Sequence, residues 1–191
     1  SYTIRKLGCQ SGIILTASHN PKEYNGYKAY WDDGAQMIAP HDKNTIAEVN
    51  KIRNASEIKF KGNKELIEII GKEIDDAYMA ELKKLVLHQE CIDKYGKELK
   101  IVYTPLHGTG NIPARRILRE LGFENVYVVP EQELPDGDFP TVSYPNPEAK
   151  EAFELGLKLA KEKDADLVLA TDPDADRVGI AMKCPDGSYE L

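Results

Sequence analysis

Residues 99–129 read LKIVYTPLHGTGNIPARRILRELGFENVYVV, and this stretch decides the predicted fold. A strand is predicted over Leu99–Tyr103. A helix is predicted from Asn111 to Leu121, because apolar side chains recur there at i, i+3, i+4 and i+7 and Gly122 follows as a stop. The next predicted strand is Asn125–Val129. Strands that alternate with helices pair in parallel through right-handed crossovers, so the stretch predicts an α/β fold.

The same alternation continues towards the C-terminus. After a proline-rich loop, an amphipathic helix is predicted over residues 148–163, and strands are predicted over residues 166–171 and 178–182. Asp172–Arg177 directly follows the first of these strands. Ligands of open α/β sheets bind beyond the carboxyl ends of the strands, so this stretch is a candidate ligand site.

The N-terminal third of the chain predicts a separate part of the fold. Residues 12–17 form a continuous apolar run, which indicates a buried strand. Further elements are predicted by turn and capping signals: strands at residues 27–31 and 35–38, and helices at 42–53 and 72–88. Because a polar stretch separates the two helices, we predict domains at residues 1–58 and 59–191. The predicted fold class is α/β, with mixed, mostly parallel sheets flanked by helices.

The composition and net charge of the chain limit the kinds of binding partner that we expect. The chain has 191 residues, 41% of them hydrophobic, and a formal net charge of −7, which argues against nucleic acid or an anionic membrane as the main partner. No apolar run approaches the roughly 20 residues of a membrane span, and no N-terminal signal pattern is visible. The three scattered cysteines favour reduced thiols and predict a cytoplasmic location. The chain begins and ends inside predicted elements, so we expect a piece of a longer protein.

Three aspartates in the 172–177 stretch point to a metal site. Asp172, Asp174 and Asp176 alternate, so an extended loop places all three carboxylates on one side, where oxygen ligands suit a hard cation such as Mg²⁺. The alternative is a solvated acidic turn. An EF-hand is excluded, because Arg177 stands where its loop needs glycine and Lys183 where it needs glutamate. A guanidinium beside the cluster suits an anion shared between metal and arginine, which favours the metal site.

A second candidate site is Thr16-Ala17-Ser18-His19-Asn20-Pro21, which follows the first predicted strand. A hydroxyl followed by an imidazole at such a turn indicates a presented nucleophile, although a serine that only caps its turn is the simpler alternative. Thr16 and Asn20 stand where a hydrolase elbow has glycines, so a Ser-His-Asp triad is not indicated. Lys28 could serve this loop as an acid/base or a phosphate clamp, or it could be a solvated strand lysine.

Gly108-Thr109-Gly110 follows a strand and precedes a helix, as in dinucleotide-binding turns. Pro113 replaces the third glycine of that pattern, so no nucleotide is predicted. We expect a tight turn whose N–H groups help to bind an anion.

The two candidate loops together resemble the α-D-phosphohexomutase superfamily, which includes phosphoglucomutase, phosphomannomutase and phosphopentomutase. Both motifs match in order and separation. Thr104-Pro105-Leu106-His107-Gly108-Thr109-Gly110 and Tyr24-Asn25-Gly26-Tyr27-Lys28 are most similar to the phosphoglucomutase and phosphopentomutase branch. The resemblance implies a four-domain enzyme of which this chain holds the late part of the first domain and nearly all of the second.

The resemblance also implies a role for each site residue. Ser18 is the expected phosphoserine, and its oxygen joins a Mg²⁺ held by three aspartates: Asp172, Asp174 and Asp176. Lys28 is the expected general acid/base, His19 a phosphate or proton-handling neighbour, and Arg177 a clamp on the transferring group. The implied substrates are a sugar monophosphate and a sugar bisphosphate, interconverted between 1- and 6-phosphate, with glucose as the first choice.

Several alternatives stay open at this point. The chain could be a catalytically silent metal- and phosphate-binding module, and for this piece alone silence is the expected behaviour. A metal-dependent phosphatase is a weaker alternative, since no water-activating base is evident. Mannose or pentose phosphates could replace glucose phosphates. The implied partners are the remaining domains of the parent chain, with pairing of two truncated chains as a further alternative.

Overall fold

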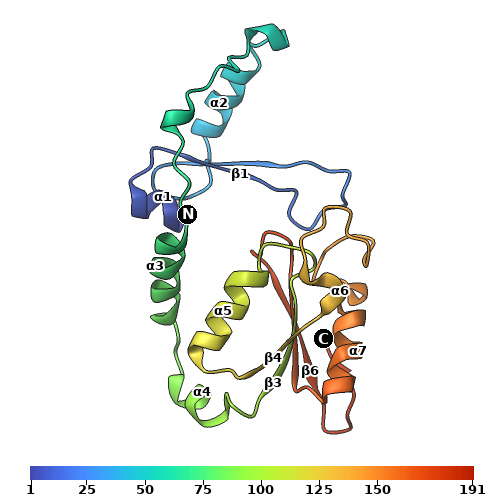
Figure 1. Ribbon diagram of the computed structural model, residues 1–191. Coiled ribbons are helices and arrows are strands. Elements are labelled where there is room, and N and C mark those ends of the chain that lie inside the picture. The colour runs from blue at the N-terminus through green and yellow to red at the C-terminus, as the bar shows by residue number, and fades with distance from the viewer. The chain divides into compact units, whose positions relative to one another are not determined.

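The computed structural model describes all 191 residues, and the chain divides into two compact units (Figure 1). The first unit contains residues 1–15 and 27–80, and the second contains residues 16–26 and 81–191. The loop that carries Ser18 therefore belongs to the second unit, although first-unit strands precede and follow it in the sequence.

A five-stranded mixed sheet forms the centre of the second unit, in the order β4-β3-β5-β6-β7. The strands are β3 (Lys100–Thr104), β4 (Asn125–Val128), β5 (Leu167–Thr171), β6 (Val178–Lys183) and β7 (Tyr189–Glu190). β3 pairs in parallel with both β4 and β5, whereas β6 and β7 are antiparallel to their neighbours. The short connection from β5 to β6 permits only antiparallel pairing, because a parallel pair needs a long crossover. The sheet confirms the predicted mixed α/β fold.

Helices cover both faces of this sheet. Figure 1 shows α5 (Asn111–Leu121) on one side and α7 (Glu154–Lys163) on the other, where α7 packs against β3 and β5. The connection from β3 through α5 moves outward to β4, and the connection through α7 returns across β3 to β5. Right-handed crossovers in opposite directions place their helices on opposite faces. The strand order therefore reverses between β3 and β5.

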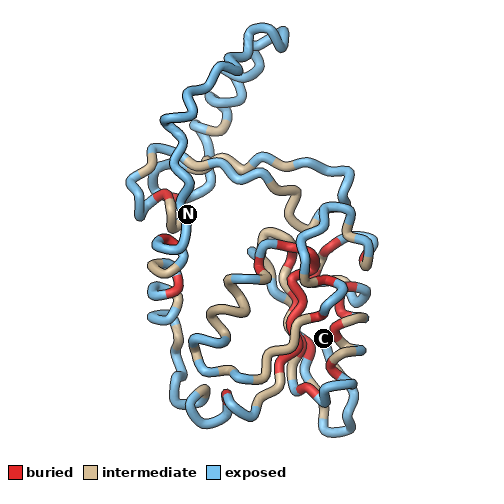
Figure 2. Tube along the Cα trace, in the orientation of Figure 1, coloured by how far each residue is buried: buried red, intermediate tan, exposed pale blue.

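The core of the second unit follows from this layering. The interior strand β3 is buried from Ile101 to Thr104, as expected for a strand covered on both faces (Figure 2). Phe153, at the end of a 3₁₀ turn over Lys150–Phe153, and Tyr103 are the largest fully buried side chains, and burial of each such side chain contributes about 1.5–3 kcal/mol. That 3₁₀ turn occupies the start of the helix predicted over residues 148–163, so α7 begins only at Glu154.

The smaller elements complete the second unit. They are α4 (Gln89–Tyr95) and α6 (Pro130–Glu133). The helix predicted over residues 72–88 is α3 (Lys72–Lys83), which ends five residues earlier than expected.

The sheet of the first unit has two antiparallel strands, β1 (Gly12–Leu15) and β2 (Tyr27–Tyr30). The prediction of a buried strand is wrong here, because Ile13 is 59% and Leu15 is 75% exposed. β1 pairs only with β2, and its three large apolar side chains, Ile13, Ile14 and Leu15, are 41–75% exposed. The strand predicted over residues 35–38 is reduced to an isolated bridge between Gln36 and Tyr30.

Helices form the rest of the first unit. They are α1 (Tyr2–Leu7), α2 (His41–Val49), the 3₁₀ turns Ala55–Glu57 and Lys64–Leu66, and most of α3. None of the helices in the chain has the length and apolar character that a bilayer crossing requires.

Candidate active site

The loop of residues 16–26 carries Ser18, and its two ends, Thr16 and Gly26, lie against each other and form a closed neck. The Thr16 N–H donates to the Gly26 carbonyl at 3.1 Å, and a Cβ on Gly26 would lie only 1.7 Å from the Thr16 carbonyl oxygen. Only glycine fits this approach. Ser18 has φ 54°, an uncommon conformation for a residue with a side chain, and its N–H donates to Thr16 Oγ1 at 2.8 Å. The sequence thus builds a turn that holds the serine in one strained orientation.

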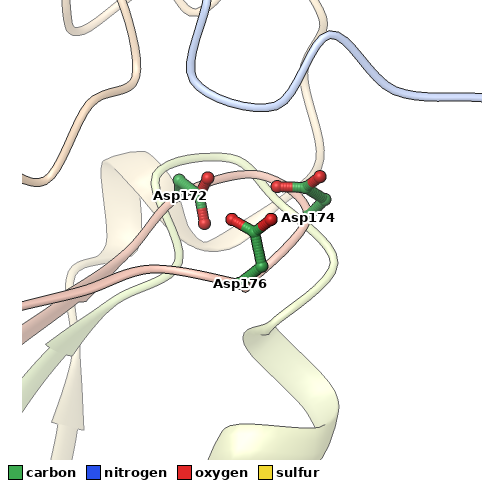
Figure 3. A group of neighbouring side chains, drawn as sticks. All are labelled: Asp172, Asp174 and Asp176. Carbon is green, nitrogen blue, oxygen red and sulfur yellow. The ribbon is translucent and has the colours of Figure 1, made fainter. Parts of the chain in front are cut away.

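The acidic loop lies at the carboxyl end of β5 and gathers its three carboxylates. Asp172, Asp174 and Asp176 each offer an oxygen, and these oxygens lie within 4.8 Å of one another (Figure 3). The Asp172 side chain is fully buried and accepts from the Arg177 N–H at 3.1 Å. Ala175, at φ 56°, donates its N–H to the Asp172 carbonyl at 3.0 Å and so closes the turn.

Ser18 meets this loop directly. Its Oγ lies 3.0 Å from Asp172 Oδ2 and 3.0 Å from Asp174 Oδ1. Its third neighbour is His19 Nδ1, at 3.3 Å. A hydroxyl carries a single hydrogen, so it cannot donate to two carboxylates at once. The serine hydroxyl and the carboxylates of the acidic loop therefore converge on one small space.

The buried carboxylate of Asp172 has a raised pKa. Burial raises the pKa of Asp172 from 3.8 to about 6, against the opposing effects of hydrogen bonds from the Arg177 N–H and the Ser18 hydroxyl; the neighbouring Asp174 carboxylate raises this pKa further. Carboxylates so close together repel one another, and a hard cation with oxygen ligands relieves that repulsion. The donor set of Asp172, Asp174, Asp176 and Ser18 therefore fits Mg²⁺ by its chemistry.

Arg177 is fixed beside the acidic loop by an ion pair. Its Nη1 donates to Glu148 Oε1 at 2.8 Å, and the Arg177 side chain is about 38% exposed. No sequence pattern indicated Glu148 as a partner, because that residue lies 29 positions away, at the start of the helix predicted over residues 148–163.

The loop after β3 supports the acidic loop from the neighbouring strand. The N–H and Oγ1 of Thr109 both donate to the Pro173 carbonyl, at 2.8 and 2.9 Å. A Cβ on Gly108 would lie 2.3 Å from Pro173 Cα, so the two loops touch through backbone. The expectation that residues 108–110 offer free N–H groups to an anion is wrong for Thr109, because Pro173 already accepts from it. The glycine spacing of this turn could not indicate the contact between Thr109 and Pro173, because the two residues are far apart in the sequence.

Lys28 does not belong to this group of residues in the second unit. It lies in β2 of the first unit, opposite Ile14 in the register. Its role as acid/base stays a prediction from the resemblance.

The site lies where open α/β sheets bind ligands. The loop of residues 105–110 follows the carboxyl end of β3, and the acidic loop follows that of β5. The strand order reverses between these two strands. Fold and site together define an α/β protein with a serine facing a carboxylate cluster at the topological switch point.

Comparisons with known proteins agree with this class. The family model "Phosphoglucomutase/phosphomannomutase, alpha/beta/alpha domain II" matches residues 76–187, and the domain I model of the same family matches residues 1–56. The chain therefore belongs to the phosphoglucomutase/phosphomannomutase family.

Individual relatives match along the whole chain. A "Probable phosphomannomutase" of Haemophilus influenzae is 36% identical over 193 residues, covering 100% of this chain and 38% of the relative. A human glucose 1,6-bisphosphate synthase is 40% identical over 197 residues, covering 100% and 31%. The crystal structure of a presumed phosphomannomutase from Thermus thermophilus superposes with a TM-score of 0.75 at 26% identity, covering 98% of this chain and 39% of that one. The chain thus spans about a third of the length of the curated relatives it matches.

Proposed function

We propose that this chain is the phosphoserine- and metal-binding part of a longer sugar-phosphate mutase. The observation that carries the proposal is the 3.0 Å approach of Ser18 Oγ to the carboxylates of Asp172 and Asp174. Family membership and relatives named for phosphomannose and glucose bisphosphate chemistry support it. Since the chain aligns with 31–38% of those relatives, the activity is proposed for the full-length parent and not for these residues alone.

The proposed reaction is an exchange of one phosphoryl group between Ser18 and a sugar. With Ser18 phosphorylated, a sugar hydroxyl attacks the phosphorus, the bond from phosphorus to Ser18 Oγ breaks, and the proton of the sugar hydroxyl ends on Oγ. The sugar bisphosphate then turns over and returns its other phosphoryl group to Ser18. No net phosphate is gained or lost, so a 1-phosphate becomes a 6-phosphate. Such transfer depends mainly on alignment and on charges that stabilise the phosphoryl oxygens.

Asp172, Asp174, Asp176 and Ser18 are the residues we propose to hold Mg²⁺. When bound, the ion neutralises negative charge that develops on the transferring group. The carboxylates themselves keep Ser18 Oγ at one place, which limits the directions from which phosphorus can be approached.

The remaining roles belong to three nitrogen-bearing side chains. His19 Nδ1 lies 3.3 Å from Ser18 Oγ and is suited to hold or release the serine proton. Arg177 is proposed to leave Glu148 for the equatorial oxygens of the phosphoryl group, since bidentate contact with phosphate suits a guanidinium. Lys28 is proposed as the acid/base that exchanges the sugar proton, on the resemblance alone.

Glucose phosphates are the proposed substrates, and mannose and pentose phosphates are the alternatives. We further propose domains at residues 1–58 and 59–191, a cytoplasmic location and the remaining parts of the parent chain as partners. The domain boundary rests on the polar stretch between the two predicted helices, the location on three cysteines scattered along the sequence, and the partners on the family resemblance.

Replacement of the serine tests the proposal. In the full-length parent, Ser18→Ala is expected to lower mutase turnover roughly a thousandfold or more, because the phosphate carrier is lost. Ser188→Ala removes a hydroxyl from an exposed turn and is expected to leave turnover unchanged. Mutase turnover retained in Ser18→Ala would overturn the assignment.

A further inference from the structure

A second cluster of polar side chains lies beside the candidate site and is buried. Its centre is His107, which is 5% exposed, and its other members include Thr104 and Gln132, at 0% and 1%. His107 Nδ1 lies 3.2 Å from the Leu134 carbonyl, and Nε2 lies 2.9 Å from Thr141 Oγ1. Buried polar groups are costly without partners, and no buried side-chain nitrogen or oxygen in the chain lacks one.

The hydrogen bonds of this cluster run in one consistent direction. A carbonyl only accepts, so His107 Nδ1 carries the hydrogen and Nε2 accepts from the Thr141 hydroxyl. Thr141 Oγ1 in turn accepts from Gln132 Nε2 at 3.0 Å, and Gln132 Oε1 accepts from the Thr104 hydroxyl at 2.7 Å. The cluster therefore joins the end of β3, α6 and the loop of residues 134–142 into one network.

One branch of the network leads to the acidic loop. Leu106 and His107 have φ values of 46° and 60°, so the chain turns sharply at two consecutive residues with side chains. The next two residues are Gly108 and Thr109, which contact Pro173 between Asp172 and Asp174. The buried ring of His107 thus fixes the turn that supports the metal-binding carboxylates.

The other branch leads to the loop that carries Ser18. The His107 carbonyl accepts from the Asp136 N–H at 3.3 Å, and Asp136 Oδ1 accepts from the Asp138 N–H at 2.9 Å. Asp138 Oδ1 then pairs with Lys22 Nζ at 3.1 Å, four residues after Ser18. This pair is exposed, and through it the loop of residues 134–142 contacts the loop that carries Ser18.

We infer that His107 is a positioning residue that holds the Ser18 loop and the acidic loop in one fixed relationship through this buried network. The inference deepens the proposed function, on which its catalytic meaning rests. His107 touches neither Ser18 nor the carboxylates in the hydrogen bonds described above, and it acts through the backbone of its own turn and of residues 134–142.

Amide hydrogen exchange in the metal-free 191-residue chain tests the coupling without metal, phosphate or activity. The two reporters are the N–H of Thr109, which donates to Pro173, and the N–H of Ser18, which donates to Thr16. His107→Ala is expected to speed exchange at both roughly tenfold, while the Ile180 amide in β6 keeps its rate. His107→Asn keeps a donor near the Nδ1 position and tolerates a positive φ, so we expect rates within about threefold of the original chain.

Two controls separate positioning from a general loss of stability. Ile101→Val trims a buried side chain at the other end of β3, and His88→Ala removes an exposed histidine before α4. Neither is expected to change the ratio of the Thr109 and Ser18 rates to the Ile180 rate. Should His107→Ala not fold, Thr141→Val removes the hydroxyl that links His107 to Gln132 and is expected to give the same pattern.

Unchanged exchange at Ser18 in His107→Ala and Thr141→Val would overturn the inference, as would equal acceleration in Ile101→Val. A titration with Mg²⁺ is the separate readout for the proposed function. His107→Ala is expected to weaken Mg²⁺ binding roughly fivefold or more, with Ile101→Val unchanged. If the original chain binds no Mg²⁺, the proposed metal site fails, and the exchange rates still decide the role of His107.

Discussion

The Ser18 hydroxyl lies 3.0 Å from the Asp172 carboxylate although 154 positions separate the two residues in the sequence. The two residues leave different strands, but their loops belong to the same compact unit. A hydroxyl that faces a buried carboxylate and a second carboxylate is suited to carry a dianionic group only when a cation balances the charge. The chemistry of the site therefore depends on this relationship.

Removal of one carboxylate is expected to weaken Mg²⁺ binding. At a hundredfold excess over its dissociation constant, Mg²⁺ should stabilise the chain by about 2.7 kcal/mol, which raises the melting temperature by roughly 5–10 °C. Asp174→Asn should lower the affinity roughly tenfold or more. Asp186→Asn, in the turn before β7, is the matched control, and an equal loss of affinity there would argue against a specific site.

The stability of the metal-free chain should depend on pH through Asp172. The folded chain raises the pKa of Asp172 from 3.8 to about 6, so folding favours the protonated form. The stabilising contribution of this group is full below about pH 4 and is lost as the pH rises through about 6. Asp172→Asn should therefore raise the melting temperature relative to the original chain more at pH 8 than at pH 4. An equal difference at the two pH values would contradict the raised pKa.

Protons and Mg²⁺ should compete at the same carboxylate. Because a protonated Asp172 is a poorer ligand, Mg²⁺ affinity should fall as the pH is lowered through about 6. Calorimetric titrations at about pH 5 and about pH 7.5 check this. Equal affinities at the two pH values would exclude Asp172 from the metal site.

Closure of the Ser18 loop should require glycine at position 26. A Cβ there would lie 1.7 Å from the Thr16 carbonyl oxygen, so Gly26→Ala must open the neck of the loop. We expect a cost of roughly 1–3 kcal/mol in unfolding free energy and loss of phosphoryl uptake by Ser18. Gly62→Ala, where a Cβ meets nothing within 4 Å, is the control. Unimpaired uptake in Gly26→Ala would show that the loop tolerates an open neck.

The second unit was largely predictable because its elements carry strong local signals. The period of α5 and the alternating burial of β5 both follow from side-chain spacing, and the strand preceding Asp172 located the acidic loop. The meeting of Ser18 with Asp172 and Asp174 was inferred from resemblance, since no local pattern specifies a contact over such a separation.

Other features could not be predicted because they depend on tertiary neighbours. The apolar run at residues 12–17 indicated a buried strand, but β1 has only β2 beside it and remains exposed. Glu148, Lys22 and Asp138 are ordinary surface residue types, and only the folded backbone brings each to its partner. The positive φ values of Leu106 and His107 and the partners of the buried His107 ring likewise depend on tertiary contacts, and no local sequence pattern indicates them.

The most direct measurement is the mass of the peptide containing Ser18 after the full-length parent is incubated with glucose 1,6-bisphosphate and Mg²⁺. We expect one added phosphoryl group, located on Ser18, with none in Ser18→Ala and strongly reduced uptake in Asp174→Asn. Phosphoryl uptake on another residue, or full uptake by Ser18 in the Asp174→Asn variant, would contradict the claim that Ser18 and the acidic loop form one site.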